Sequence, residues 1–309
     1  MILTITANPS VDISYRLDDF KIDDVTRTEK VSKDAGGKGI HVGFVLKELG
    51  LNPIHSGFIG GKLGEYIEEE LGKKGQESRF VKVSQDTRNC IAILHNGKQT
   101  EILEGGPTIS DKEANYFLEN LGSISKDCKI INMSGSLPKG LTSDFYKKII
   151  AYARSKGIFV SVDTSGQSLI DVIKAEKKPD LIKPNETEIA QVMGRKVNKE
   201  DLREILLEEP FKDIKYVIVS MGKDGAIVKA GNRVYNAIVP EVKAINPVGS
   251  GDSSLAGALF AIEKDMDDEE IIKTSMTCGL LNVLTEEIAH IDIEKFDYYF
   301  EKIQVKELI

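Results

Sequence analysis

Short runs of β-branched and other apolar residues alternate with helical patterns over most of the chain, and this alternation limits the fold more than any other feature. Strand–helix–strand order at this spacing predicts an α/β fold with a mainly parallel central sheet, covered by helices on both faces. The predicted strands are residues 2–7, 54–59, 130–133, 158–162, 181–182 and 216–219. The predicted helices between them are residues 40–49, 65–71, 112–121, 144–155, 186–193 and 199–207.

Two stretches, 12–34 and 88–104, interrupt the alternation with short strand patterns, and Asn96-Gly97 predicts a hairpin turn in the second. We expect a small sheet inserted at the carboxyl ends of the main strands, where it would form a lid over a bound ligand. Because no linker or repeat is evident, we predict one domain over residues 1–309. Its C-terminal part is predicted to be helical over 252–264, 268–286 and 294–302.

Acidic residues outnumber basic ones, 49 against 41, which gives a net charge of −8. A field of this sign repels polyanions, so we expect no nucleic-acid partner, whereas a few cations in one cleft still suffice for a small phosphorylated ligand. No apolar run approaches the ~18–20 residues that span a bilayer. The N-terminus lacks the basic lead of a signal peptide. We therefore predict no membrane contact and a cytoplasmic location.

The three cysteines and four histidines show no spacing typical of a disulfide framework, a metal site or a hydrolase triad. A Walker-type phosphate loop and a complete dinucleotide fingerprint are also absent from the sequence. The motifs therefore give no support to a metalloenzyme, a serine hydrolase or a nicotinamide dehydrogenase.

Two glycine-rich segments each precede a predicted helix. In Ala35-Gly36-Gly37-Lys38-Gly39, the backbone N–H groups, the helix dipole and the Lys38 ammonium can hold an anion, although such turns also serve only to connect strand and helix. In the second, Gly249-Ser250-Gly251 can present N–H groups to a transferring phosphoryl group, and Asp252 can accept a proton from an attacking alcohol. The alternative role for Asp252 is a helix cap.

Two further loops have both a structural and a functional interpretation. Residues 220–226 form either a turn between strands or a loop that binds nucleotide phosphates. After Lys183-Pro184, Asn185 is placed to cap a helix. Glu188 can in addition orient water around a magnesium ion, since bound magnesium keeps several waters.

Three charged residues near the predicted lid suit a polar ligand. Asp12, just past the first strand, can accept hydrogen bonds from sugar hydroxyls. Arg27 and Arg88 lie one in each lid stretch, and their forked donors suit a phosphate. The alternative for all three is a solvated surface side chain.

Together and in this order, the motifs resemble the ribokinase-like (PfkB) family of carbohydrate kinases over nearly the whole chain. The resemblance implies a ribokinase-like three-layer α/β/α sandwich with a β-sheet lid, and a homodimer formed through the lid sheets. It rests on six segments: Asn8-Pro9-Ser10-Val11-Asp12, Ala35-Gly36-Gly37-Lys38-Gly39, Ser134-Gly135-Ser136-Leu137-Pro138-Lys139-Gly140, Lys183-Pro184-Asn185-x-x-Glu188, Ser220-x-Gly222-x-x-Gly225 and Gly249-Ser250-Gly251-Asp252.

The resemblance also implies a role for each motif, with Asp252 as the catalytic base. The phosphoryl group would lie in an anion hole formed by Gly249, Ser250 and Gly251. ATP would bind at Lys183, Asn185, Ser220, Gly222, Gly225, Gly249 and Gly251, and Mg²⁺ would be placed by Glu188 through water. The sugar would contact Asp12, Gly37, Lys38 and His41. From their placement in the lid stretches and the first glycine-rich motif, we expect Lys38, Arg27 and Arg88 to bind the phosphate of the sugar, with Ser136 as a neutral donor.

Within the family, the sequence is similar to the branch that acts on phosphosugars. This implies ATP-dependent phosphorylation of the C1 hydroxyl of a ketohexose 6-phosphate, with D-tagatose 6-phosphate as the first candidate. Fructose 1-phosphate and fructose 6-phosphate are alternative acceptors, and a non-catalytic sensor of sugar phosphates is the more distant alternative. Two positions depart from the family pattern: His41 stands where asparagine is usual, and Asn246-Pro247 where many members have Asp-Thr.

Overall fold

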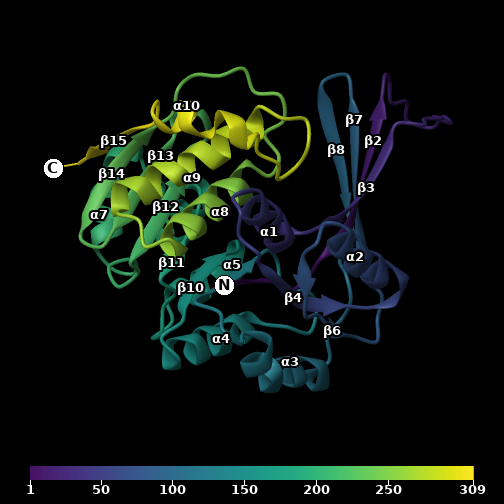
Figure 1. The fold of residues 1–309 in the computed structure, drawn as a ribbon, viewed down its shortest axis with the longest axis horizontal. Coiled ribbons are helices and arrows are strands. Elements are labelled where there is room, and N and C mark those ends of the chain that lie inside the picture. Colours follow the sequence, from purple (N-terminus) through teal and green to yellow (C-terminus); the bar gives the residue numbers. More distant parts are fainter. Residues whose placement is uncertain (309) are drawn as a thin grey trace.

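The computed structural model describes residues 1–308, and its elements form two sheets with surrounding helices (Figure 1). In the larger sheet the strands lie in the spatial order β15 (Gln304–Glu307), β14 (Arg233–Ile238), β13 (Ala226–Ala230), β12 (Tyr216–Ser220), β11 (Leu181–Ile182), β10 (Phe159–Asp163), β9 (Ile130–Ser134), β1 (Ile2–Thr6), β4 (Ile54–Ile59) and β5 (Glu77–Ser78). Along this order, neighbouring strands from β12 to β5 are parallel, and those from β15 to β12 are antiparallel. A further strand, β6 (Val81–Lys82), pairs with β4.

Helices cover both faces of this sheet, and each face has its own apolar core (Figure 1). Because side chains alternate along a strand, Val217 of β12 packs on one face and Ile218 on the other. The predicted three-layer sandwich is therefore confirmed. The first face is covered by α3 (Asp111–Ile124), α4 (Ser143–Ser155), α5 (Gly166–Ile173), α6 (Glu186–Met193) and α7 (Leu202–Leu207). The second face is covered by α1 (Lys38–Glu48), α8 (Ser250–Glu263) and α9 (Asp268–Val283), with α10 (Phe296–Phe300) packed on α9.

The smaller sheet has the order β3 (Val31–Gly36), β2 (Ser10–Leu17), β7 (Arg88–His95) and β8 (Lys98–Leu103). It projects from the body beside α1 and α2 (Gly61–Lys73) (Figure 1). The predicted small inserted sheet is thus confirmed, and we call it the lid sheet. Asn96 and Gly97 both have positive φ, 49° and 69°, as a tight hairpin turn between β7 and β8 requires.

Several predicted boundaries are wrong. Residues 18–30, predicted to continue the strands of the first lid stretch, form no strand; this segment is polar and almost wholly exposed. The helix predicted over 268–286 ends at Val283, and the Thr285 hydroxyl just beyond it donates to the carbonyl of Asn282, which has no partner inside the helix. The end of the chain forms the edge strand β15, which was not predicted, and neither was α5, which begins at a glycine.

Two helices of the second layer pack unusually closely. A Cβ on Gly257 of α8 would lie 2.6 Å from the Thr274 carbonyl oxygen of α9, so only glycine fits there. As a result α8 is buried over most of its length. None of the helices in residues 1–308 combines the length and the apolar composition needed to cross a membrane.

Candidate active site

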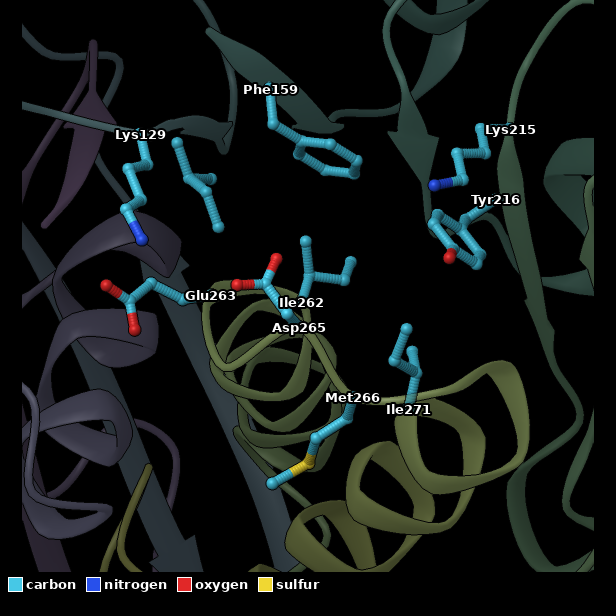
Figure 2. Close-up of a pocket in the computed structure, with 10 residues that line it drawn as sticks. Lys129, Phe159, Lys215, Tyr216, Ile262, Glu263, Asp265, Met266 and Ile271 are labelled. Carbon is cyan, nitrogen blue, oxygen red and sulfur yellow. The ribbon is translucent and has the colours of Figure 1, made fainter.

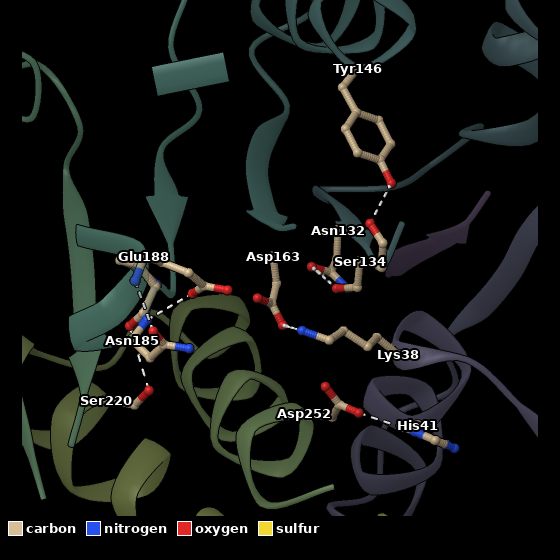
Figure 3. A network of polar contacts seen from close by, with 12 residues as sticks. Lys38, His41, Asn132, Ser134, Tyr146, Asp163, Asn185, Glu188, Ser220 and Asp252 are labelled. Carbon is tan, nitrogen blue, oxygen red and sulfur yellow. Dashed lines mark hydrogen bonds and ion pairs between the residues drawn. The ribbon is translucent and has the colours of Figure 1, made fainter. Parts of the chain in front are cut away.

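Polar side chains gather where the parallel strands β9, β10, β11 and β12 end and the helices α1, α6 and α8 begin (Figure 3). In such sheets the strand ends leave room for a ligand at the carboxyl edge. In Figure 3, Asn185, Glu188 and Ser220 lie on one side and His41 on the other, with Asp163, Lys38 and Asp252 between them.

Asp252 is the third residue of α8, but it does not cap the helix. The N-cap residue is Gly249, and no side chain there accepts a hydrogen bond from the first turn. Instead, Asp252 Oδ2 lies 3.1 Å from Nδ1 of His41. The cap interpretation of Asp252 is therefore excluded, and its carboxylate, only 10% exposed, faces the polar cluster. This leaves Oδ1 available to a ligand.

The start of α8 is shaped for an anion. Gly249 has φ +82°, and a Cβ there would lie 2.8 Å from the backbone nitrogen of Ala289. Because the first N–H groups of a helix have no partner inside it, those of Gly251 and Asp252 remain for a ligand. The N–H of Ser250, also predicted for the anion hole, donates to the Pro247 carbonyl at 3.3 Å. Negative charge is thus favoured at this helix start.

A largely buried lysine lies beside this helix start. Lys183 follows β11, is 7% exposed, and its Nζ lies 3.1 Å from the position that a Cβ on Gly251 would take. Within residues 1–308, no carboxylate forms an ion pair with it. An anionic ligand between Lys183 and the first turn of α8 would therefore pair with this ammonium group and stabilise the site.

Lys38, in the first turn of α1, contacts a carboxylate that was not predicted. Its Nζ lies 3.3 Å from Oδ2 of Asp163, whose side chain is 4% exposed. The Asp163 charge raises the pKa of Lys38, and burial opposes this only in part. One sequence signal was available: Asp163 directly follows the predicted strand 158–162, where polar residues point toward a ligand at the carboxyl edge.

His41 lies one turn further along α1, between two carboxylates. Its Nδ1 faces Asp252, and its Nε2 lies 3.4 Å from Oδ2 of Asp12. Burial of the ring lowers the pKa of His41, but hydrogen bonds to Asp12 and Asp252 outweigh this and raise it to about 10. Neither ring nitrogen is left for a sugar hydroxyl in this arrangement, so the predicted direct sugar contact requires one ion pair to open.

Asp12 projects from β2 over a glycine. A Cβ on Gly36 would lie 2.0 Å from the Asp12 carboxyl carbon, so a larger residue at Gly36 would displace the carboxylate. Asp12 Oδ1 accepts a hydrogen bond of 2.6 Å from the Ser10 hydroxyl. Gly37, the N-cap of α1, has φ +112°, which turns the chain from the lid sheet into the helix. The lid strand and α1 thereby place Asp12 and His41 together.

The structure does not gather all residues predicted to bind the phosphate of a sugar. The Arg88 guanidinium donates to the carbonyls of Glu104, at 2.9 Å, and Asn8, at 3.1 Å, and so fastens the base of the lid sheet. Arg27 lies in the exposed segment 18–30, and Ser136 is exposed just after β9. Among the described residues, no hydrogen bond or ion pair ties Arg27 or Ser136 to the cluster around Asp252.

The residues predicted to bind nucleotide form the other side of the cluster. Asn185 Oδ1 accepts from the Glu188 N–H, and Glu188 Oε2 accepts from the Asn185 N–H, both at 2.9 Å, so the predicted cap is confirmed. Glu188 Oε1 stays free of this capping box. The Ser220 hydroxyl donates to the Pro184 carbonyl at 3.5 Å, which joins the two loops.

The loop after β12 contains two glycines with positive φ, Gly222 at 57° and Gly225 at 82°. A Cβ on Gly225 would lie 2.0 Å from the Ala237 carbonyl oxygen, so this glycine is required by the turn itself. At Gly222 nothing lies within 4 Å of such a Cβ, and the loop is open there. The turn interpretation thus explains Gly225, while Gly222 leaves space beside the cluster.

A separate cavity of about 350 Å³ lies at the opposite edge of the sheet (Figure 2). Its lining includes Lys129, Phe159 and Tyr216, which stand at the starts of β9, β10 and β12, and Glu263 and Met266 near the end of α8. Figure 2 shows apolar side chains and separated charges there, without a base beside an anion-binding helix start. This cavity lacks the combination found around Asp252.

Comparisons with known proteins show the family of the chain. The family model described as pfkB family carbohydrate kinase matches residues 5–294. The chain is 46% identical to a tagatose-6-phosphate kinase of Staphylococcus epidermidis, over all of both chains. A structure described as a possible 1-phosphofructokinase from Thermotoga maritima is 26% identical, with a TM-score of 0.90 over 100% of this chain and 99% of that one. Phosphofructokinase-2 of Escherichia coli with fructose-6-phosphate shares the fold, at 23% identity, 97% and 98% coverage and a TM-score of 0.88.

Proposed function

Because the chain belongs to the pfkB family of carbohydrate kinases, we propose that it transfers the γ-phosphoryl group of ATP to the C1 hydroxyl of D-tagatose 6-phosphate, giving tagatose 1,6-bisphosphate. The relative at 46% identity over both full chains supports this acceptor. One observation supports this chemistry above all. The Asp252 carboxylate does not cap α8, and only its Oδ2 contacts His41, so Oδ1 is free beside the anion-binding helix start.

In the proposed reaction, Asp252 accepts the proton of the C1 hydroxyl. The C1 oxygen forms its bond to the γ-phosphorus while the bond from that phosphorus to the leaving oxygen of ADP breaks. The backbone N–H groups at the start of α8 and the Lys183 ammonium offset the charge on the phosphoryl oxygens. Positioning and electrostatics supply most of the rate in phosphoryl transfer.

Magnesium fits this arrangement as an ion carried largely by the nucleotide. Within residues 1–308, no group of three or more ligating side chains could hold a metal ion by itself. Glu188 uses only Oε2 in its capping box, so Oε1 is free to hold a water of the ion. When bound with ATP, magnesium would neutralise phosphate charge. An ATP-dependent reaction also fits the cytoplasmic location predicted from the sequence, which stays a prediction.

For the phosphate of the sugar, we propose Lys38 and Arg27 as the cations, with Ser136 as a neutral donor. Arg88 contributes mainly by holding the lid base, since two of its nitrogens already donate to backbone carbonyls. The variant Arg27→Ala should raise KM for a phosphorylated sugar and leave KM for an unphosphorylated one unchanged. Arg195→Ala, an exposed arginine after α6, serves as the control. Equal effects of Arg27→Ala on both sugars would rule out the phosphate role.

We further propose a homodimer formed through the lid sheets. An isolated sheet needs cover for its edges and apolar side chains. Five large apolar residues in or beside the lid sheet are exposed, led by Ile22 at 89%, Val25 at 71% and Leu103 at 62%. Light scattering at micromolar concentration should give the mass of two chains, and Leu103→Asp should shift it toward one. A single-chain mass for the wild type would contradict the dimer.

The acceptor is tested by measuring ADP release with magnesium and ATP across tagatose 6-phosphate, fructose 6-phosphate, fructose 1-phosphate and ribose. We expect the highest kcat/KM with tagatose 6-phosphate. One inverted hydroxyl changes about one hydrogen bond, so the margin over fructose 6-phosphate should be roughly 10- to 100-fold. A preference for fructose 1-phosphate would instead favour the activity named for the Thermotoga maritima neighbour. No turnover with any sugar phosphate would favour a non-catalytic sensor.

A further inference from the structure

We propose that His41, as an imidazolium, is a positioning residue that joins the sugar-side carboxylate Asp12 to the base Asp252 and fixes which Asp252 oxygen receives the proton. The catalytic part of this inference rests on the proposed kinase function. An asparagine at this position would carry no charge and could not form such a doubly ionic link.

The positions of the two ring nitrogens carry the inference. Nδ1 lies 3.1 Å from Asp252 Oδ2, and Nε2 lies 3.4 Å from Asp12 Oδ2. An ionised carboxylate only accepts hydrogen bonds, and a neutral imidazole has only one N–H. A neutral ring would therefore turn a lone pair toward one of the two carboxylates. Only a doubly protonated ring can donate to Asp252 and also present an N–H to Asp12, so the arrangement of one hydrogen bond and one ion-pair contact favours the imidazolium.

The charges around the ring support the same protonation state. His41 faces Asp252 of α8 and Asp12 of β2, and Asp34 lies opposite Asp12 in the β2–β3 register. On its own helix, Lys38 is the nearest cation, but it is paired with Asp163 of β10. With only 13% of its side chain exposed, His41 is poorly screened by water, and its pKa is raised to about 10 in spite of the opposing effect of burial.

Two consequences follow for the reaction. The ion pair occupies Asp252 Oδ2 and leaves Oδ1 to face the acceptor hydroxyl, while His41 keeps both of its protons throughout. In addition, the ring connects the lid strand β2 to the buried helix α8, so the residue that contacts the sugar and the residue that accepts its proton are held at one spacing. A small error in such a spacing lowers kcat strongly.

Two variants separate this role from simple packing. His41→Leu removes the hydrogen bond to Asp252, the ion-pair contact with Asp12 and the charge, and should lower kcat for tagatose 6-phosphate about 10- to 100-fold, with less than a threefold change in KM. His41→Asn restores one donor but neither the charge nor the second contact, and should recover kcat only in part. In the wild type kcat should fall as pH rises through about 10, whereas His41→Asn should lack this fall. ADP is measured directly, because coupling enzymes fail at such pH. A kcat of His41→Leu within twofold of wild type, or identical pH profiles of His41→Asn and wild type, would overturn the proposal.

A measurement that requires no turnover tests the inference separately from the kinase function. Imidazole ¹⁵N chemical shifts in the unliganded protein should show His41 doubly protonated at pH 8, assigned by the signal lost in His41→Asn. His95→Asn, at the exposed tip of the lid sheet, is the matched control and should leave that signal in place. If His41 titrates near pH 6.5, the link is wrong even if the wild type phosphorylates sugar phosphates. If His41 is doubly protonated but no sugar phosphate is turned over, the link stands and the kinase function is wrong.

Discussion

The two halves of the site differ in how firmly they are held. Asp252 stands on α8, which packs against α9 and α1 and is buried over most of its length. Asp12 stands on the lid sheet, where every residue of β8 is exposed and every residue of β7 is only partly buried. The group that would accept the proton is therefore on the rigid side, and the group that would bind the sugar is on the side with few apolar contacts.

This difference predicts which half of the site moves when a ligand binds. Segments with little buried apolar surface open at low free energy, whereas packed core helices open only with the whole fold. We therefore expect the outer part of the lid sheet to move when the sugar binds, while its base at Asp12, tied through His41 to α8, and α8 itself stay in place. The anion-binding helix start is then formed before any ligand arrives. The following changes test that comparison, beginning with the largest expected effect.

The sharpest change on the rigid side is Asp252→Asn. It removes the proposed base and keeps the shape of the side chain, so kcat should fall about 10²- to 10⁴-fold. Because Asp252 caps no helix, the melting temperature should fall only through the loss of its ion pair with His41. Asp265→Asn, just after the other end of α8, is the matched control and should keep wild-type kcat. If Asp252→Asn retained near wild-type kcat with substrate binding intact, Asp252 would not be the base.

Acid should destabilise the body through His55 of β4. This ring is fully buried between Thr4 and Gln76, and burial lowers the pKa of His55 to about 4. The unfolded chain binds the proton at about pH 6.5, so stability from this group is present above that pH and lost as pH falls toward 4. The loss should be on the order of 3 kcal/mol.

Urea unfolding at pH 7 and pH 4.5 measures this loss, and His55→Gln should lack that part of it. His95→Asn in the lid sheet should lose as much unfolding free energy as the wild type. This result would show that the loss comes from His55 in the larger sheet and not from the lid sheet. Equal losses for wild type and His55→Gln would show that His55 does not limit acid stability.

Two glycine substitutions compare the packing of the halves directly. Gly257→Ala places a methyl group 2.6 Å from the Thr274 carbonyl oxygen and 2.9 Å from Cys278 Sγ, and should reduce the free energy of unfolding by about 1–3 kcal/mol. Gly105→Ala, beside the lid sheet, meets nothing within 4 Å and should change it by less than about 0.5 kcal/mol. Similar values from urea titrations would remove the distinction between the halves.

The smallest effect is expected where the lid sheet touches the C-terminal part of the body. Arg16 of β2 pairs with Glu286 at 2.7 Å, and both side chains are half or more exposed, at 50% and 68%. An exposed pair contributes about 0.2–1 kcal/mol, so Arg16→Ala should hardly change stability. A double-mutant cycle with Glu286→Ala gives the coupling energy. A value above about 2 kcal/mol would mean that the lid sheet is fastened as firmly as the helices.

The sequence predicted the layers and the lid sheet because these depend on local patterns, whereas the roles assigned to the site residues stay predictions. Periodicity located α6 from Glu186 to Met193 without error, and Asn96-Gly97 located the hairpin. The interactions between distant segments were not predictable, since the pairing of Lys38 with Asp163 and the place of His41 between two carboxylates depend on how α1 lies against β10, β2 and α8. Asp163 alone had a local signal, its position directly after a predicted strand.

The position of His41 between the two carboxylates also affects how this site can evolve. Histidine and asparagine codons differ only in their first base, so one nucleotide substitution exchanges the charged side chain for the neutral one. Because His41 is held by its neighbours and caps no helix, the exchange requires no rearrangement of α1. A population can therefore gain or lose the alkaline limit of this site in one mutational event, and closely related lineages living at different pH are where we expect to find both forms.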